Sequence, residues 1–503
     1  MTDLPRLGPA ALPGLPAGVA RPAYDRRALA PGIVHLGIGA FARAHLAVAT
    51  ESAITADPAR PDLRWGLVGV SLRQPDTRDA LAPQQGLYTV AVRDADTEGR
   101  PRQALQVVGC LTRLLVAPED PGAVLEALAH PQARIASLTV TEKGYLRDPA
   151  GAGPWWDHPD IVHDLAHPQA PRSTLGFLVH ALALRRQRGL APLTLLSLDN
   201  LPANGHTLQA LVTAFAQRVD AELARWIEAR CTFPSSMVDR IVPRTTDDDR
   251  EQASCALGAR DAWPVLAEPF LDWAVEDRFA AGRPAWDAGG ARFVAAAEPW
   301  ERLKLRMVNG SHSAIAYLGA MAGWDTVDRA IAQPALRAYV EALLRDEVEP
   351  TLPPLPGLDP AAYRARLLAR FANPALAHRT QQIAMDGTQK LPQRLLGPLR
   401  ERLATGAPVA RLGLALAAWL HYLRGVDEAG RAYPLQDPLA AELAALHRRA
   451  QAGAGAEERA RAFTHYAPVF GDLADHPVLV PVLARALESL EVHGVRRTLE
   501  SAA

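Results

Sequence analysis

The sequence predicts an α/β protein in which a Rossmann-type, doubly wound sheet comes first and a mostly α-helical domain follows. Short apolar segments alternate with segments of helical periodicity over roughly the first 290 residues, which is the pattern of a parallel sheet. From about Pro299 onward the strand signals fade and helical periodicity takes over. A chain of 503 residues is too long for one hydrophobic core. We therefore expect two domains, residues 1–290 and 291–503.

The first strand signal runs from Gly32 to Leu36 and leads into a Gly-x-Gly turn, with a helix expected from Ala42 to about Thr55. In such a turn the first glycine permits the tight bend and the second lets the backbone approach a pyrophosphate at the helix N-terminus. The expected cofactor-binding residues of this turn are Gly37, Ile38, Gly39, Ala40 and Phe41.

The second strand signal, Trp65 to Leu72, should end in an acidic residue if the ribose hydroxyls of NAD are bound there. Asp76 comes a few residues late, and Arg73 offers a positive charge that would suit the 2′-phosphate of NADP. We take Asp76 as the candidate and NAD as the expected cofactor, with NADP as the open alternative.

Two further buried strands are predicted at Ile135 to Thr141 and Leu193 to Leu198, with a helix at Thr174 to Arg188 between them. Ligands of a parallel sheet bind beyond the C-terminal ends of its strands. Lys143 follows the first of these strands, and Asn200 and Asn204 follow the second.

The second half of the chain shows helical periodicity in six places. The predicted helices are Leu303 to Met321, Leu336 to Val348, Tyr363 to Phe371, Arg411 to Leu423, Pro438 to Gln451 and Val482 to Leu490.

One stretch of the first of these helices concentrates rare residues. The chain has three lysines among 54 Lys and Arg, and four asparagines. Lys304, Asn309 and His312 nevertheless follow one another at spacing K-x4-N-x2-H, near enough on a helix for one site. A lysine retained in so arginine-rich a chain suggests a group that must release a proton.

Charge and cysteine content restrict the function. The net charge is −1, so nothing favours nucleic acid or a membrane surface as partner. Three scattered cysteines make neither a disulfide framework nor a Cys-rich zinc site. We expect no signal peptide in Met1 to Arg21 and no membrane span. The expectation is a cytoplasmic enzyme for a small molecule, as a monomer or small homo-oligomer.

Several motifs in one order resemble the polyol-specific long-chain dehydrogenases, the mannitol dehydrogenase family, from about Ile33 to Gly406. The segments that carry the resemblance are Gly37 to His45, Ser137 to Tyr145, Asp199 to His206, Phe233 to Pro243, Glu268 to Phe270 and Leu303 to Ser313. Ala42 departs from the pattern, since many members have histidine there.

This resemblance implies a Rossmann domain for the dinucleotide, a helical domain for substrate and catalysis, and hydride transfer to or from NAD(P) without a metal. It places the catalytic lysine at Lys304, the oxyanion-stabilising asparagines at Asn200 and Asn309, and the substrate-orienting histidine at His312. Glu301 matches the glutamate that neighbours the lysine.

Within the family, His378 to Arg394 resembles fructuronate reductase, the enzyme that interconverts D-fructuronate and D-mannonate. A sugar-acid substrate needs a cation for its carboxylate, and Lys143, Arg379 and Lys390 are the candidates. The alternatives are that Arg379 and Lys390 pair with local acids such as Asp386, and that the enzyme is a mannitol or D-arabinitol dehydrogenase.

The residues limit the chemistry further. Ligands for a catalytic zinc are missing, and none of the three lysines belongs to a Tyr-x3-Lys motif. A lysine base needs its pKa lowered, and burial together with the charge of Arg306 would lower it. A sensor that binds the dinucleotide without catalysis would have no need for such a lysine.

Overall fold

In the computed structural model the chain folds into two compact units. The first unit comprises Met1–Asp94 and Pro101–Glu298, and the main part of the second is Pro299–Ala503. The structure describes residues 4–95, 100–149, 151, 153–451 and 455–502. The boundary placed near residue 290 from the sequence lies just before β11, the last strand of the first unit.

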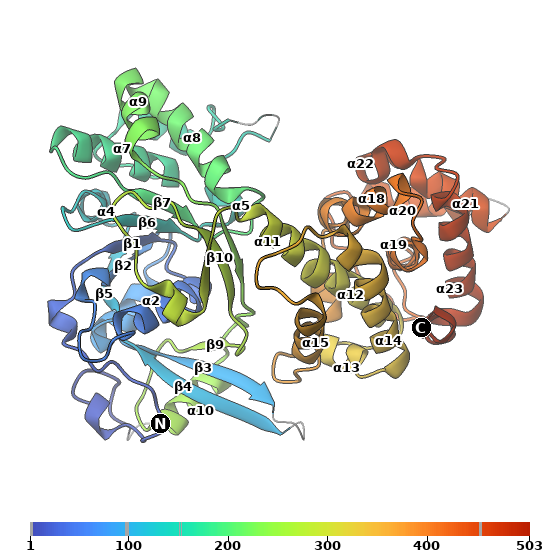
Figure 1. The fold of residues 1–503 in the computed structure, drawn as a ribbon, viewed down its shortest axis with the longest axis horizontal. Helices are drawn as coiled ribbons and strands as arrows, with labels where there is room; N and C mark the ends of the chain where they lie inside the picture. Colours follow the sequence, from blue (N-terminus) through green and yellow to red (C-terminus); the bar gives the residue numbers. More distant parts are fainter. Residues whose placement is uncertain (1–3, 96–99, 150, 152, 452–454, 503) are drawn as a thin grey trace. The chain divides into compact units, whose positions relative to one another are not determined.

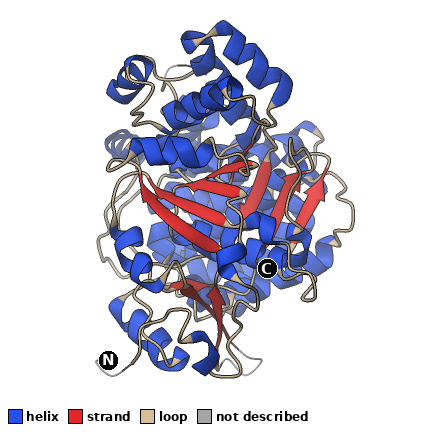
Figure 2. Ribbon diagram, turned by 90° about the vertical axis from the view of Figure 1, so that its left-hand side faces the viewer, coloured by secondary structure: helices blue, strands red, loops and turns tan. Residues whose placement is uncertain are grey.

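A five-stranded, all-parallel sheet forms the centre of the first unit (Figures 1 and 2). Its strands, in spatial order, are β5 (Leu111–Val116), β2 (Leu67–Ser71), β1 (Ile33–Leu36), β6 (Ile135–Leu138) and β7 (Thr194–Ser197). The strand order reverses between β1 and β6, so this is the switch point at which a doubly wound sheet binds its ligand. The predicted doubly wound fold is confirmed.

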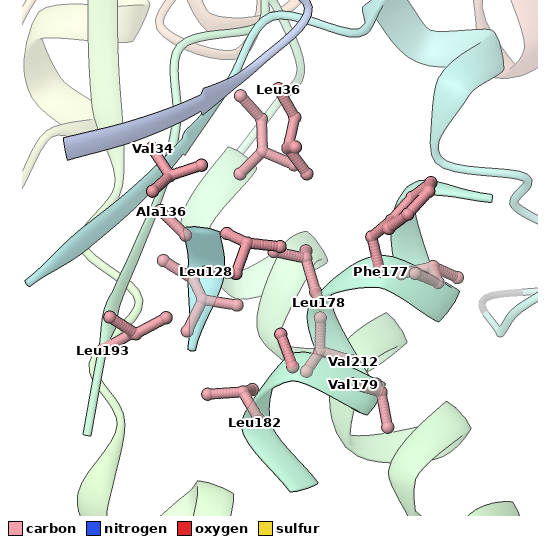
Figure 3. Packing of buried hydrophobic residues seen from close by; sticks show 14 of the residues in the cluster. Val34, Leu36, Leu128, Ala136, Phe177, Leu178, Val179, Leu182, Leu193 and Val212 are labelled. Carbon is pink, nitrogen blue, oxygen red and sulfur yellow. The ribbon is translucent and has the colours of Figure 1, made fainter. Parts of the chain in front are cut away.

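Helices cover both faces of this sheet because neighbouring side chains of a strand point to opposite faces. Val34 and Leu36 of β1 pack with Leu128, Phe177 and Leu178 of the helices on one face (Figure 3). Ile33 packs with the opposite cluster, which contains α1 and α2. The helices of the unit are α1 (Ala40–Ala44), α2 (Leu46–Ile54), α3 (Asp76–Leu81), α4 (Pro121–Leu128), α5 (Thr141–Gly144), α6 (Pro159–Ala166), α7 (Thr174–Gln187), α8 (Asn204–Val219), α9 (Ala221–Arg230) and α10 (Asp247–Leu257).

Two small sheets that the sequence analysis did not predict complete the first unit. One contains β4 (Pro101–Val108), β3 (Tyr88–Ala95) and β9 (Val265–Ala267), and the other β11 (Ala291–Val294), β10 (Asp272–Glu276) and β8 (Ser236–Asp239). The strand β5 of the central sheet was also missed. In β5 and the outer half of β3, exposed polar residues interrupt the apolar run, so the strand signal is weak.

The described part of the second unit is helical throughout, and all six predicted helices are present. The helical elements are α11 (Glu298–Leu303), η6 (Lys304–Gly310), α12 (Ser311–Met321), α13 (Val327–Ile331), α14 (Pro334–Ala342), η7 (Leu343–Val348), α15 (Pro360–Phe371), α16 (Thr380–Ile383), α17 (Gly387–Leu391), η9 (Pro392–Leu396), α18 (Gly397–Ala404), α19 (Ala410–Tyr422), α20 (Ala440–Gln451), α21 (Ala456–Thr464), α22 (Ala467–Phe470) and α23 (Leu479–Ala502). Of these, η6, η7 and η9 are π-helical. The helix α12, buried along its whole length, packs against α19 and α16.

Among the described residues, none of the helices combines the length and the apolar composition needed to span a lipid bilayer.

Candidate active site

The glycine turn after β1 is built for close backbone approach. Gly37 has φ +93°, and a Cβ atom there would lie 2.2 Å from the carbonyl oxygen of Thr139. Gly37 is therefore required both by its left-handed backbone and by its contact with the end of β6. Gly39 begins α1 as its N-cap and has no atom closer than 3.9 Å to the position of a Cβ. The turn thus fits the pyrophosphate of a dinucleotide.

A buried histidine is connected to the glycine turn by hydrogen bonds through Thr139. The ring nitrogens of His35 in β1 lie 2.9 Å from Ser137 Oγ and 2.9 Å from Thr139 Oγ1, and Thr139 Oγ1 donates to the carbonyl oxygen of Gly37. Burial lowers the pKa of His35 to about 4, so the ring is neutral at neutral pH. The sequence analysis did not single out His35.

A pocket of about 510 Å³ opens at this turn, at the C-terminal ends of β1, β2 and β6. Of the residues predicted for the cofactor, Gly37, Ile38 and Gly39 line it. Ala40 and Phe41 lie in α1, and Asp76 is the exposed first residue of α3; none of these three is among the lining residues. Arg73 and Lys143 do line the pocket.

The opposite wall of the pocket is the start of α7, held by a buried carboxylate. Asp164 accepts hydrogen bonds from the backbone amides of Arg172 (2.7 Å) and Ser173 (2.8 Å) and from the Ser173 hydroxyl (2.6 Å). Arg172, Ser173 and Thr174 line the pocket. The carboxylate of Asp164 therefore fixes the shape of this wall.

Asp199, which directly precedes Asn200, ties the end of β7 to the end of β6. Its carboxylate accepts from the amides of Val140 (3.0 Å) and Thr141 (2.9 Å) and from the hydroxyl of Tyr145 (2.8 Å). Thr141 has φ +62°, a strained conformation for a β-branched residue. The hydrogen bond from the Thr141 amide to Asp199 helps to hold it there. Asn200, the next residue after Asp199, is exposed.

Asn204, the other asparagine after β7, has a structural role. Its buried amide group donates to the carbonyl oxygens of Asp199 (3.0 Å) and Ser236 (2.8 Å) and accepts from the amide of Ser236 (2.9 Å). It thus joins the end of β7 to β8.

In the second unit, the stretch that carries the rare residues is a π-helix, η6, inserted between α11 and α12. In an α-helix, Lys304 and Asn309 would lie about 140° apart around the axis. The i→i+5 hydrogen bonds of a π-helix instead place residues five apart on one face. The backbone of η6 therefore aligns buried Lys304 with half-buried Asn309. The side-chain amide of Asn309 has no hydrogen-bond partner among the described residues, which leaves it available to a ligand.

Arg306, which we expected to act on Lys304 through its charge, is engaged elsewhere. Its guanidinium forms a bidentate ion pair with Glu401 (2.7 and 2.6 Å) and donates to the carbonyl oxygen of Thr351 (2.7 Å). A positive charge neutralised in this way has little effect on a neighbouring lysine. Arg306 fastens η6 to α18.

His312 is the second residue of α12 and is buried against Phe371, with ring centroids 4.4 Å apart. The second histidine, His378, lies 5.8 Å away in an edge-on arrangement. Burial, followed by unfavourable electrostatic interactions with His378, Arg370 and Arg394, holds the pKa of His312 well below its ordinary value. His312 is thus a neutral ring at neutral pH, with two arginines nearby.

The three predicted carboxylate-binding cations differ in their local contacts. Lys390 donates to the carbonyl oxygen of Met385 (2.6 Å) and lies 3.7 Å from Asp386, so the local pairing considered as the alternative is present. Arg379 is exposed at the start of α16 and has no carboxylate partner in the described part of the chain. Lys143 belongs to the nucleotide pocket.

Glu301 is half-buried in α11, one helical turn before Lys304. Across the residues that the structure describes, no three His, Cys, Asp or Glu side chains are grouped so as to hold a metal ion.

Comparison with known proteins follows the division into two units. Residues 31–288 match the mannitol dehydrogenase Rossmann domain, and residues 296–491 match the mannitol dehydrogenase C-terminal domain. The chain is 42% identical to D-mannonate oxidoreductase of Escherichia coli over 484 residues, which cover 95% of this chain and 97% of that protein. It is 40% identical to mannitol 2-dehydrogenase of Phaeosphaeria nodorum over 485 residues, covering 95% of this chain and 82% of that protein.

Among solved structures, mannitol 2-dehydrogenase of Pseudomonas fluorescens, in a ternary complex with NAD and D-mannitol, is similar with a TM-score of 0.82 and 36% identity over 99% of both chains. The two domain matches together cover most of the sequence, and full-length relatives exceed one third identity. The chain therefore belongs to the mannitol dehydrogenase family of oxidoreductases, with that family's Rossmann domain followed by its C-terminal domain.

Proposed function

We propose that the protein is an NAD-dependent oxidoreductase that interconverts D-fructuronate and D-mannonate. One observation carries the choice of a sugar acid over an uncharged polyol. The guanidinium of Arg394 acts on His312 by its positive charge and donates to the neighbouring Ser313, and it has no carboxylate partner among the described residues. Such surroundings favour an anionic substrate, since burying a carboxylate without a cation costs several kcal/mol, on the order of the penalty for any unpaired buried charge. The D-mannonate oxidoreductase relative supports the same choice.

The residues of the first unit bind the dinucleotide in this proposal. The Gly37–Gly39 turn approaches the pyrophosphate, and the strand ends at Thr139–Thr141 line the pocket beside it. When bound, the nicotinamide accepts or supplies the hydride. NAD is the proposed form, as in the solved relative.

The residues of the second unit act on the substrate. Lys304 takes the proton of the reacting hydroxyl in the direction of oxidation and returns it in reduction. Asn309, aligned with Lys304 on η6, donates its amide N–H to the oxygen as negative charge develops. The neutral ring of His312 forms a hydrogen bond to a substrate hydroxyl and orients it. Following the family resemblance, Asn200 is the second amide donor and Glu301 passes the lysine proton to water.

Substrate profiling of the purified protein tests the proposal. We expect kcat/KM for D-fructuronate with NADH to exceed that for D-fructose by 10²-fold or more, since a buried carboxylate–cation pair contributes about 3 kcal/mol or more. In the direction of oxidation with NAD, kcat/KM for D-mannonate should likewise exceed kcat/KM for D-mannitol and for D-arabinitol. A preference for the uncharged polyols would instead support the mannitol or arabinitol dehydrogenase alternative. Replacing NADH by NADPH in the same assay tests the cofactor.

A further inference from the structure

Arg394, an arginine outside the predicted set, lies directly against the segment formed by η6 and the start of α12. Arg394 belongs to η9, which packs against η6. Its Nη1 donates to the hydroxyl of Ser313 (3.2 Å) and lies at the limit of hydrogen bonding to the carbonyl oxygen of Asn309 (3.5 Å). Both contacts fall within the stretch that contains Lys304, Asn309 and His312.

A glycine permits this close packing. A Cβ atom at Gly310 would lie 3.0 Å from the carbonyl oxygen of Arg394. A larger residue there would need η6 or η9 to shift by a few tenths of an ångström. The position of Arg394 is therefore built into the packing of η6 and η9.

The charge of Arg394 is unbalanced in the described part of the chain. A guanidinium carries five N–H donors, and the two contacts above both use Nη1. The structure places no carboxylate within ion-pair distance of it among the described residues. Burial lowers the pKa of Arg394. A half-buried cation with unused donors beside a reaction site is the arrangement that binds an anionic ligand group.

The other cations near the site are less suitable. The charge of Lys390 is paired with Asp386, that of Arg306 with Glu401, and Arg379 is exposed.

In D-fructuronate the carboxylate is separated from the carbonyl carbon by four carbon–carbon bonds, a span of roughly 5 Å. Arg394 contacts the carbonyl oxygen of Asn309 and the hydroxyl of Ser313, so it lies beside the stretch that is proposed to bind the reacting end of the substrate.

We infer that Arg394 binds the substrate carboxylate and is the residue that selects sugar acids over uncharged polyols. The inference rests on the proposed function. It replaces Arg379 and Lys390 as the first candidates for this role, because their side chains are exposed or already paired.

The test compares Arg394→Gln, Arg394→Lys and the wild type on D-fructuronate and D-fructose, with NADH held saturating. Arg394→Gln should lower kcat/KM for D-fructuronate about 10²-fold or more, mainly through KM, and lower the ratio of the two kcat/KM values at least tenfold. Arg394→Lys keeps the charge but loses the planar, bidentate geometry of the guanidinium. Its ratio of kcat/KM values should therefore lie between those of the wild type and Arg394→Gln.

Arg400→Gln is the matched control. It removes the same charge six residues away, from a guanidinium paired with Asp472, and should leave the ratio within twofold of the wild type. Circular dichroism shows whether each variant is folded. If Arg394→Gln does not fold, the ratio of the two kcat/KM values in Arg394→Lys tests the inference instead.

The two possible failures are distinguishable. A wild type that prefers D-fructuronate, with an unchanged ratio in the Arg394 variants, overturns the inference and leaves the proposed function standing. A wild type that prefers D-fructose overturns both.

Discussion

At the scale of single residues, Lys304 is the group on which the proposed chemistry depends. It is buried, and η6 aligns it with Asn309. Lys304→Ala should lower kcat by 10²-fold or more while the affinity for NADH, measured by fluorescence titration, stays near that of the wild type. Lys304→Arg is the matched variant, since it keeps the positive charge but cannot release a proton near neutral pH, and it should be nearly as inactive. Near-normal turnover in either variant would remove Lys304 from the mechanism.

The asparagines separate a catalytic from a structural role for the same residue type. Asn309 has a side-chain amide without a partner among the described residues, whereas that of Asn204 is saturated by backbone groups. Asn309→Ala should reduce kcat about 10²–10³-fold with little change in melting temperature. Asn204→Ala should instead lower stability by about 1–3 kcal/mol, because buried backbone groups lose their partner. If Asn309→Ala mainly weakens NADH binding, the residue belongs to the cofactor site.

At the scale of elements, each of the three π-helical segments of the second unit positions a polar or charged side chain. The segment η6 aligns Lys304 with Asn309, and η9 carries Arg394 to the same stretch. The third, η7, contributes Glu347, whose buried carboxylate accepts from the amides of Arg411 (2.9 Å) and Leu412 (2.8 Å) at the start of α19. The N-cap residue of α19, Val409, makes no side-chain cap of its own.

Glu347→Ala should therefore destabilise the second unit. The first amides of α19 lose their acceptor in a buried position, and we expect a loss of about 1–3 kcal/mol in urea denaturation. Glu347→Gln keeps an acceptor oxygen without the charge and should recover part of that loss. Equal stability of the wild type and Glu347→Ala would show that water replaces the cap.

At the scale of the whole molecule, buried neutral histidines should make the fold sensitive to acid. Burial lowers the pKa of His35 to about 4 in the first unit, and burial with nearby Arg424 lowers that of His421 to about 3 in the second. Because an unfolded histidine titrates near pH 6.5, the unfolded state binds more protons between about pH 6.5 and 4. Stability is thus complete above pH 6.5 and falls as the pH is lowered through this window.

His35→Gln tests this dependence, because glutamine offers hydrogen-bonding groups but does not titrate. Its melting temperature should fall less between pH 7 and pH 4.5 than that of the wild type, a difference on the order of 3 kcal/mol in stability if the whole pKa shift is expressed. Parallel melting curves for the two proteins over that range would contradict the assignment of the acid sensitivity to His35.

By itself the sequence determined the features that local pattern encodes. Short continuous apolar runs located β1, β2, β6 and β7, and helical periodicity located the principal helices of the second unit. The Gly-x-Gly turn placed the nucleotide pocket, since Gly37 is the residue type that its φ requires. The rarity of lysine and asparagine directed attention to Lys304 and Asn309, and the motifs around them identified the family.

Tertiary structure decided the features that depend on contacts between distant segments. The sequence of residues 304–310 does not distinguish an α-helix from the π-helix that the structure shows, and it is the π-helix that brings Lys304 and Asn309 to one face. In the same way, the sequence does not show which of its many arginines are already paired. Arg306 forms an ion pair with Glu401, which lies 95 residues further along the chain. Arg394 instead contacts Ser313 of α12 and has no neighbouring acid among the described residues. Charge pairing across such separations is a property of the fold, because only folding brings those side chains within reach.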